Sequence, residues 1–215
     1  LNQNLERLSN KRHTNSALIS SFKGQKDFYD QLVESRDGFP EGTRYVLENP
    51  KLFPDVLGTI ADMFQVDEKY RDALESGLGD LSHCLVAQDR PSAISTVKIA
   101  NEVKAGDLTI IPLKEAGKIK IDLPPIPNNR ESMYIGSEIV KTSKDLQPLA
   151  DYLLGKLLIV NDLNTFVQND DTLDWNIVDL AGNFSGNNLI LKNRQISAHG
   201  NIIGREKRLE EIKKE

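Results

Sequence analysis

The sequence has very little sulfur and no long apolar run. Cys84 is the only cysteine in 215 residues, which excludes an internal disulfide and fits a reducing compartment. No stretch approaches the roughly 18 to 20 apolar residues of a membrane-spanning helix, and no apolar N-terminal run indicates a signal peptide. The phosphate-binding pattern G-x-x-x-x-G-K-[ST] is also missing. These absences predict a cytoplasmic chain without a membrane span and without that nucleotide site.

Histidine is scarce as well, and its positions do not form a metal-binding pattern. His13, His83 and His199 are far apart in the sequence. His83 and Cys84 are neighbours in a segment expected to be a strand, where adjacent side chains point to opposite faces and cannot easily bind one metal. We therefore expect no metal site, with Cys84 buried and His83 packed or at the surface.

No catalytic pattern is present elsewhere. An acidic cluster, which lacks the spacing and the glycine of a calcium loop, is interpreted as a solvated loop: Asp170, Asp171, Asp174 and Asp179. Residues Gly182–Gly186 do not stand between a strand and a helix, as a phosphate-binding loop does. No nucleophile has a plausible base. The sequence thus predicts a chain that is not an enzyme and binds no cofactor.

The chain does contain enough apolar sequence for a core, and its charge is unevenly placed. Hydrophobic residues make up 39% and charged residues 27%, with a formal net charge of −5, which suits one sizeable core or two small ones. Residues 192–215 contain seven Lys or Arg and four Glu, a net charge of +3, so the remainder carries −8. The overall charge argues weakly against a general polyanion binder, whereas the basic end keeps a local DNA contact open.

The residue pattern at both ends of the chain predicts helices, and neither has a capping residue at its outer end. Residues 1–37 keep a 4-3 alternation of mainly apolar residues and predict a coiled-coil arm, roughly 50 Å long, that ends at the glycines and proline of Asp37–Gly42. The same spacing starts again at 202–215. We expect the two helices to pair antiparallel and to continue as longer arms, although packing of each on the globular part stays open. The repeat positions are Leu1, Leu5, Leu8, Arg12, Asn15, Ile19, Phe22, Lys26, Tyr29 and Val33, then Ile202, Arg205, Leu209 and Ile212.

Between the arms, strand-like and helix-like segments alternate and predict two α/β units. The first covers 43–113, with an apolar run Val56–Val66, a helix Asp67–Leu78 capped by Asp67, a buried strand Leu81–Ala87, a helix Ser92–Val103 and a strand Leu108–Leu113. A Pro-rich connector follows at 114–132. The second covers 133–201, with a helix Lys144–Leu154, a strand Lys156–Val160, a short helix from Asp162 and hairpin strands Trp175–Val178 and Asn188–Leu191. Tyr45, Phe53, Phe64 and Trp175 are expected in the core.

The ordered motifs of this middle region resemble those of the hinge domain of bacterial SMC proteins, the chromosome-structuring ATPases. The family pattern V-D-x-x-Y-x-x-A-[IL]-E-x-x-L-G is matched from Val66 to Gly79, and a glycine followed by a strand ending in Pro-Leu is matched by Gly106 and Pro112-Leu113. Residues Asp151–Phe166, DYLLGKLLIVNDLNTF, are similar to the family's LLGxVxVVDDLxxA, and Ile203–Arg205 are similar to its LGR.

The resemblance implies a mixed α+β hinge of two subdomains that homodimerises and joins two coiled-coil arms, with ATPase heads and their accessory subunits at the far ends. It implies dimer contacts at Gly182, Ser197, Ala198, His199 and Gly200. The family's GGxxxGG-like cluster is reduced here to Gly200 ahead of Gly204, which leaves the geometry of the dimer open. Glycine matters at such a contact because it lacks the Cβ that keeps backbones apart.

Nucleic-acid binding and small-molecule binding are the alternatives to a hinge. Basic residues near the start of the returning helix could contact DNA phosphates weakly, single-stranded DNA included: Arg194, Arg205, Lys207, Arg208 and Lys213. The competing interpretation is that Lys207 and Lys214 are solvated and pair with Glu211 and Glu210 along the helix. A small-molecule-binding α/β domain is the third possibility.

Overall fold

A computed structural model describes residues 2–125, 133–164, 172, 174–186, 190–194 and 201–214. The chain divides into two compact units. The arm unit contains Leu1–Asp37 and Arg205–Glu215, and the globular unit contains Gly38–Gly204. No helix among the described residues is long and apolar enough to cross a membrane.

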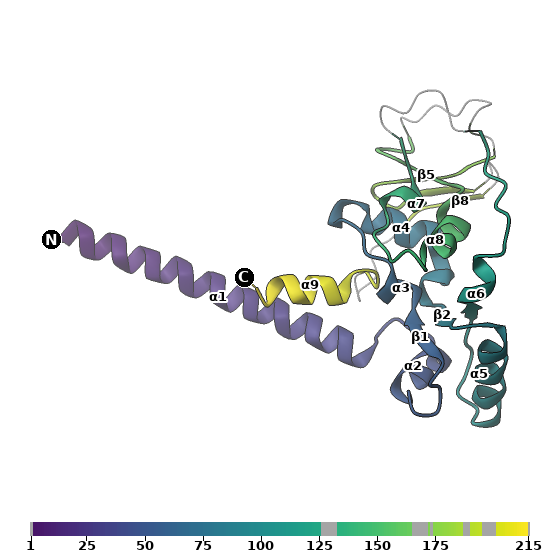
Figure 1. Cartoon of the computed structure of the whole chain (residues 1–215). Helices are drawn as coiled ribbons and strands as arrows, with labels where there is room; N and C mark the ends of the chain where they lie inside the picture. The colour runs from purple at the N-terminus through teal and green to yellow at the C-terminus, as the bar shows by residue number, and fades with distance from the viewer. Residues whose placement is uncertain are drawn as a thin grey trace. The chain divides into compact units, whose positions relative to one another are not determined.

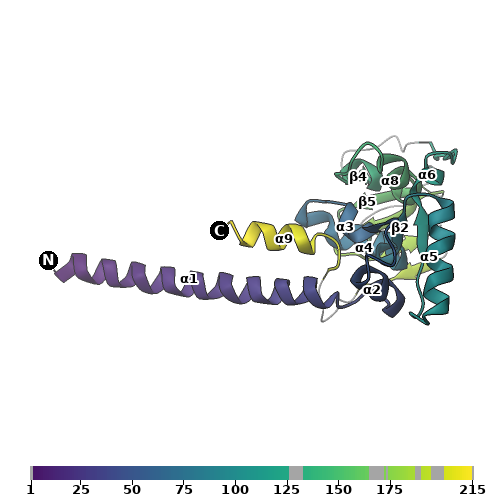
Figure 2. The same ribbon diagram turned by 60° about the horizontal axis from the view of Figure 1, so that its bottom comes forward.

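The arm unit is an antiparallel pair of helices, α1 (Asn2–Ser35) and α9 (Arg205–Ile212), which lie side by side in Figures 1 and 2. Leu209 and Ile212 of α9 and Leu32 of α1 are buried. The predicted helix pair is therefore confirmed. Because α9 has eight residues, it covers only one end of α1, and Leu8 and Ile19 are 64% and 55% exposed.

The first sheet of the globular unit has three strands, β1 (Val56–Thr59), β2 (Leu85–Ala87) and β3 (Ile110–Pro112). The order is β1-β2-β3, with β1 antiparallel and β3 parallel to β2. Helix α5 (Arg90–Glu102) connects β2 to β3 and packs on the sheet; Figure 2 shows it in teal beside β2. Asp89 caps α5 by accepting the N–H of Ser92, and Pro91 occupies the first turn, where its missing N–H costs nothing.

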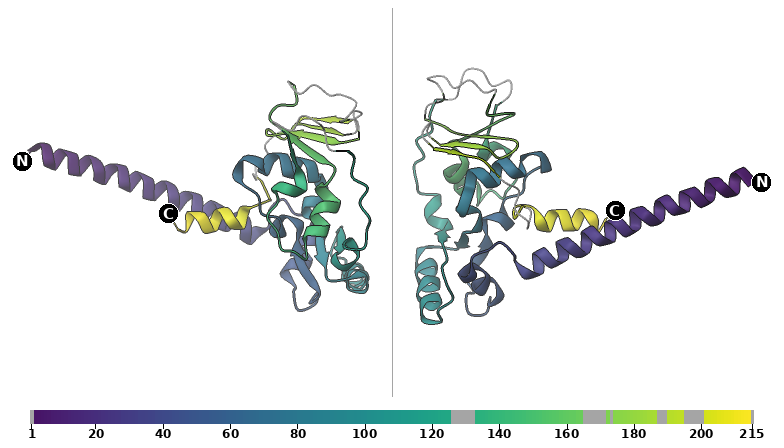
Figure 3. Two further views of the ribbon diagram at one scale, coloured as in Figure 1. Left: turned by 45° about the horizontal axis from the view of Figure 1, so that its top comes forward. Right: turned by 180° about the vertical axis from the view of Figure 1, so that it is seen from behind.

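The second sheet has five strands in sequence order, β4 (Met133–Ile135), β5 (Leu157–Val160), β6 (Asn176–Asp179), β7 (Phe184–Gly186) and β8 (Ile190–Lys192). Only β5 and β6 are parallel. Figure 3 shows these green and yellow-green strands next to one another from two sides. All four residues of β5 are buried, as expected for an apolar strand with neighbours on both sides.

Short helices join and cover the sheets. They are α2 (Glu41–Glu48), α3 (Ile60–Met63), the 3-10 turn η1 (Glu68–Tyr70), α4 (Arg71–Leu78), the 3-10 turn η2 (Gly79–His83), α6 (Leu113–Ala116), α7 (Gly136–Ile139) and α8 (Gln147–Leu154). The largest buried cluster draws on both predicted α/β regions, with Phe64 and Leu74 from the first and Leu149, Ile159 and Val178 from the second. The two sheets therefore share a core inside one compact unit.

Several predicted elements have other boundaries. The helix expected over Asp67–Leu78 is divided into η1 and α4, and the Asp67 side chain makes no capping hydrogen bond. It binds Lys141 Nζ at 2.6 Å instead. The strand expected from Leu81 begins only at Leu85, because η2 occupies the preceding residues. His83 and Cys84 are therefore not neighbours in a strand, which removes the reason given above against a shared metal.

The region after β5 differs most from expectation. Asp162 begins no helix within 161–164; its carboxylate accepts the N–H of Asn164 in a tight turn. The two strands predicted as a hairpin are not partners, since β7, which the sequence analysis missed, lies between β6 and β8. Asp179, assigned above to a solvated loop, is 2% exposed and accepts N–H groups from Leu163 and Asn183.

The predicted aromatic core and the buried thiol are confirmed. Phe53, Phe64 and Trp175 are at most 3% exposed, and Tyr45 packs against the cluster around Phe53. Burial raises the pKa of the Cys84 thiol. No group of three metal-binding side chains occurs in the part of the chain that the structure describes.

Candidate functional site

Strand β8, at the edge of the five-stranded sheet, exposes two large apolar side chains. All three residues of β8 are exposed, and Ile190 and Leu191 are 52% and 79% exposed. An edge strand offers unpaired backbone N–H and C=O groups to any strand that approaches it. Lys192 is the one charged residue on this edge, and its Nζ lies 5.8 Å from the centre of the Phe184 ring. The edge is thus suited to pairing with another strand.

The edges of the three-stranded sheet are less regular. In β1 the pairing register shifts between Val56 and Gly58, and Gly58 has a φ of +139°. Leu57, in the middle of this irregularity, is 49% exposed. At the opposite edge, β3 ends at Pro112, which has no N–H to donate. A bulge or a proline limits how far a partner strand can pair.

Arg194, which the sequence analysis placed in a DNA contact, is held inside the globular unit. Its side chain is 13% exposed. It donates to the backbone oxygen of Asp72 at 3.0 Å and to Oδ1 of Asn201 at 2.6 Å. It also lies 3.4 Å from the carboxylate of Asp72 and 3.6 Å from that of Glu75. A phosphate would have to compete with these acceptors.

The two carboxylates of this arrangement were not among the residues predicted from the sequence. Asp72 and Glu75 are three residues apart on α4, so they lie on one face of the helix. Glu75 Oε2 also accepts the backbone N–H of Ile202 at 3.1 Å. We call Arg194, Asp72, Glu75, Asn201 and the Ile202 N–H the Arg194 cluster. The spacing of the two acids was visible in the sequence, but their basic partner lies more than a hundred residues away.

Of the other predicted DNA-contacting residues, Arg205, Lys207 and Arg208 lie on α9, and Lys213 follows its last residue. Arg205 is 5% exposed and donates to the backbone oxygen of Asp37 at 2.6 Å, within the arm unit. Arg208 is 3.5 Å from Glu211, the residue that was expected above to pair with Lys207. Lys207 is partly exposed and Lys213 exposed.

Lys213 takes part in an ion-pair cluster that joins the two helices of the arm unit. Its Nζ lies 3.3 Å from Asp30 of α1, which also pairs with Lys26 one turn earlier at 2.5 Å. The hydrogen bond from Lys26, with a further contribution from Lys213, lowers the pKa of Asp30. Lys213 can reach a phosphate only by giving up part of this pairing.

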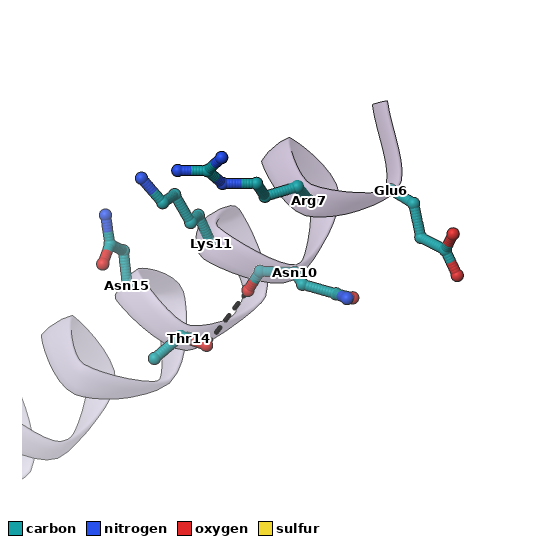
Figure 4. Close-up of a pocket in the computed structure, with 6 residues that line it drawn as sticks. All are labelled: Glu6, Arg7, Asn10, Lys11, Thr14 and Asn15. Atoms are coloured by element: carbon teal, nitrogen blue, oxygen red, sulfur yellow. Dashed lines mark hydrogen bonds between the residues drawn. The ribbon is translucent and has the colours of Figure 1, made fainter. Parts of the chain in front are cut away.

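A further basic face lies on α1. Figure 4 shows Arg7, Lys11 and Asn15 extending to one side of the helix, while the Thr14 hydroxyl donates to the backbone oxygen of Asn10 at 3.0 Å. These residues line a shallow hollow on successive turns of one helix. No second element among the described residues closes it, so it cannot enclose a ligand.

Of the five predicted dimer contacts, only Gly182 lies within the described residues; Ser197, Ala198, His199 and Gly200 lie outside them. Gly182 has a φ of +85°. A Cβ on it would lie 2.5 Å from Arg194 Cδ and 3.1 Å from the backbone oxygen of Asp72. The fold of a single chain therefore already requires glycine at this position.

The change Gly182→Ala is expected to lower the free energy of unfolding by about 1–2 kcal/mol, because the left-handed backbone conformation disfavours any Cβ. Urea unfolding followed by circular dichroism measures the loss. An effect that vanishes on dilution to the monomer would contradict this reason and point to a contact between two copies.

The sequence and the fold are similar to those of known hinge domains. A family model described as the SMC proteins flexible hinge domain matches residues 53–165. The chromosome partition protein Smc of Halothermothrix orenii is 25% identical over 196 residues, covering 86% of this chain and 16% of that protein. The Smc protein of Bacillus subtilis is 22% identical over 208 residues, covering 91% of this chain and 17% of that protein. The chain thus spans only a small part of these relatives.

Solved structures of low sequence identity share the fold. A crystal structure of an asymmetric dimer of the Geobacillus stearothermophilus SMC hinge domain superimposes with a TM-score of 0.74 at 19% identity, covering 94% of this chain and 83% of that one. The Pyrococcus furiosus SMC hinge domain gives a TM-score of 0.58 at 19% identity, covering 82% and 91%. Since the family match extends over more than half of the chain and the two-sheet fold agrees with it, this chain belongs to the SMC hinge domain family.

Proposed function

We propose that this chain is the homodimerisation hinge of a bacterial chromosome-partition SMC protein and joins the coiled-coil arms of two such molecules. The observation that carries the proposal is the exposed edge of β8, with Ile190 and Leu191 in water. A second copy of the chain would cover these side chains and pair the free backbone groups of the strand. The dimer named for the Geobacillus stearothermophilus hinge supports the same assembly.

In this proposal each protomer adds its β8 edge to the three-stranded sheet of the partner, where the irregularity in β1 and Pro112 at the end of β3 keep the pairing short. A two-fold arrangement uses that contact twice, so both copies are held at two places. Residues 43–113 and 133–201 act as the two subdomains, 114–132 as their linker, and 1–37 with 202–215 as the arm. The contacts predicted at residues 197–200 belong to the same interface in this proposal, whereas Gly182 packs against Arg194 and Asp72 of its own chain.

The chain itself has a mechanical role in this proposal and no catalytic one. ATP would be bound and hydrolysed by head domains of the full-length protein, to which accessory subunits also bind. The hinge needs no cofactor for that role. We place the protein in the cytoplasm, associated with the nucleoid.

Leu191→Asp tests the dimer, because an unpaired carboxylate would have to be buried at the centre of the new sheet pairing. We expect the dissociation constant to rise by about 30-fold or more, the effect of losing a central interface residue. Light scattering during size exclusion over a dilution series would follow the mass between 24.1 kDa and twice that value. The control is Tyr152→Asp, since Tyr152 is also exposed, at 50%, but belongs to helix α8 and not to an edge strand.

A wild-type chain that stays at 24.1 kDa at the highest usable concentration contradicts the hinge proposal. A dimer that Leu191→Asp leaves intact contradicts β8 as the contact, although it would still allow dimerisation elsewhere.

A weak DNA contact through the arm unit is the second candidate function. The observation that favours it is the exposure of Lys207 on α9 and of Lys213 just after it, together with the basic face with Arg7 and Lys11 on α1. Binding of single- or double-stranded DNA through phosphates would weaken steeply with salt. Fluorescence anisotropy of labelled DNA over a salt series, with Lys207→Glu as the variant, tests it; a salt-independent affinity argues against it.

A further inference from the structure

Helix α4 holds both ends of the segment that leads from β8 toward α9. Arg194 follows β8 by two residues, and Asn201 lies four residues before α9 begins. Through the Arg194 cluster, both are attached to the acidic face of α4. We propose that Arg194 is a positioning residue that transmits the state of the β8 edge to the residues entering α9. The proposal rests on dimerisation at β8.

The first link runs from the strand to the helix. Arg194 donates to the backbone oxygen of Asp72 and pairs with the carboxylates of Asp72 and Glu75. Helix α4 also packs on β6 and β7, the strands that precede β8 in the sheet. When a strand of a second copy pairs with β8, the new hydrogen bonds fix the backbone of β8. Because Arg194 is only two residues away, that pairing restricts where its guanidinium can lie.

The second link runs from the helix to the arm entry. Glu75 both faces Arg194 at 3.6 Å and accepts the N–H of Ile202 at 3.1 Å. The guanidinium of Arg194 also donates directly to Asn201. Any displacement of this guanidinium therefore changes the surroundings of Glu75, Asn201 and the Ile202 N–H together.

The low exposure of these side chains strengthens the attraction between the Arg194 guanidinium and its carboxylate partners. The side chains of Arg194 and Glu75 are 13% and 14% exposed, so water and salt screen their attraction only partly. Asp72, at 35%, is more accessible. Without the guanidinium, two carboxylates on one helix face would repel each other, and Glu75 would lose a cation that lies 3.6 Å from it.

The residues after the cluster leave little room to absorb a displacement. Ile202 and Ile203 are 8% and 1% exposed and belong to the main buried cluster. Gly204 has a φ of +78°, and a Cβ on it would lie 3.0 Å from Nε of Arg71. Packed interiors transmit shifts because they contain few voids. A change at Ile202 is thus passed along the chain to Gly204, the last residue of the globular unit before α9.

The test compares four forms of the 215-residue chain by hydrogen exchange at the Ile202 amide, with the mass measured in parallel. The forms are the wild type, Leu191→Asp, Arg194→Met, and the double variant. Arg194→Met keeps the length of the side chain and removes its charge and donors. The matched control is Arg90→Met, alone and with Leu191→Asp, since Arg90 is exposed at the start of α5. The Ile159 amide, in the buried strand β5, serves as the internal reference.

We expect exchange at Ile202 to be about tenfold slower in the wild-type dimer than in Leu191→Asp, the effect of strengthening one hydrogen bond to a charged acceptor. We expect no such difference between Arg194→Met and the double variant, although the mass of Arg194→Met alone is still that of a dimer. In the Arg90→Met background the tenfold difference remains. Exchange at Ile159 stays the same in Arg194→Met and the wild type.

Three results would overturn the inference. A tenfold difference at Ile202 that survives Arg194→Met would show that the arm entry senses β8 without this residue. Equal acceleration at Ile159 and Ile202 would mean that Arg194 only stabilises the fold. A wild-type dimer with the same Ile202 exchange as Leu191→Asp would defeat the coupling and leave the hinge intact, whereas a monomeric wild type would defeat the hinge proposal itself.

Discussion

Replacing Trp175 with alanine is expected to lower the free energy of unfolding by about 3–5 kcal/mol, the usual cost of removing a fully buried large aromatic side chain. Trp175 is 0% exposed and packs with Ile135, Leu158, Val160 and Ile177, residues from β4, β5 and β6. Alanine would leave a cavity on one side of the five-stranded sheet. Urea unfolding at a fixed protein concentration measures the effect, since a dimer's stability depends on concentration.

The indole N–H of Trp175 adds a smaller contribution, which a second variant isolates. It donates to the backbone oxygen of Pro125 at 3.3 Å, so the ring also binds the proline-rich connector at this residue. Trp175→Phe keeps most of the ring and removes this bond, with an expected loss of about 1 kcal/mol. If the two substitutions cost the same, the hydrogen bond and not the filled volume would be the main contribution.

Gly42→Ala is expected to cost about 3 kcal/mol, at the upper end of overpacking effects, because the added Cβ meets backbone that cannot rotate away. The Cβ would lie 2.5 Å from the oxygen of Asp107 and 2.6 Å from that of Gly106. Gly106, with a φ of +96°, faces Gly42 in return. The loop before β3 therefore lies directly against α2, and only glycine permits this approach. The shift of the urea midpoint measures the cost.

Gly24→Ala is the matched control, and its effect should have the opposite sign. Gly24 lies within α1, and a Cβ on it would have no atom within 4 Å. Alanine is favoured over glycine in a helix by about 1 kcal/mol, so α1 should become more helical and more stable. A Gly42→Ala variant as stable as the wild type would mean that α2 and the loop before β3 can separate at little cost.

The elements found from sequence are those whose signal is local. Leu157–Val160 is a short run of apolar residues after a helix ending at Leu154, and it is a buried strand as predicted. The repeat over 1–35 predicts a long helix, and α1 extends from Asn2 to Ser35. Apolar spacing acts over a few residues, so it can be recognised without knowing what lies opposite.

The elements missed are those whose partner is remote. Phe184–Gly186 contains a glycine and a serine, residues that are unfavourable in strands. It becomes β7 because it pairs with β6 on one side and β8 on the other. Asp179 likewise looked like part of a solvated acidic loop, but its carboxylate is buried where it accepts N–H groups from Leu163 and Asn183. Such placement depends on the sheet and not on neighbouring residues.

The sequence by itself determined that two terminal helices flank a mixed α/β region with the ordered motifs of an SMC hinge. Only the tertiary structure decided how the basic residues near α9 are used. Arg194, Arg205 and Lys207 look alike in the sequence. In the structure the Arg194 side chain is 13% exposed and Arg205 is buried, each against acceptors of the protein, while Lys207 stays partly exposed. The physical reason is that a charged side chain can be buried only where partners offset its loss of hydration. For Arg194 those partners, Asp72 and Glu75, are supplied by a helix far away in the chain.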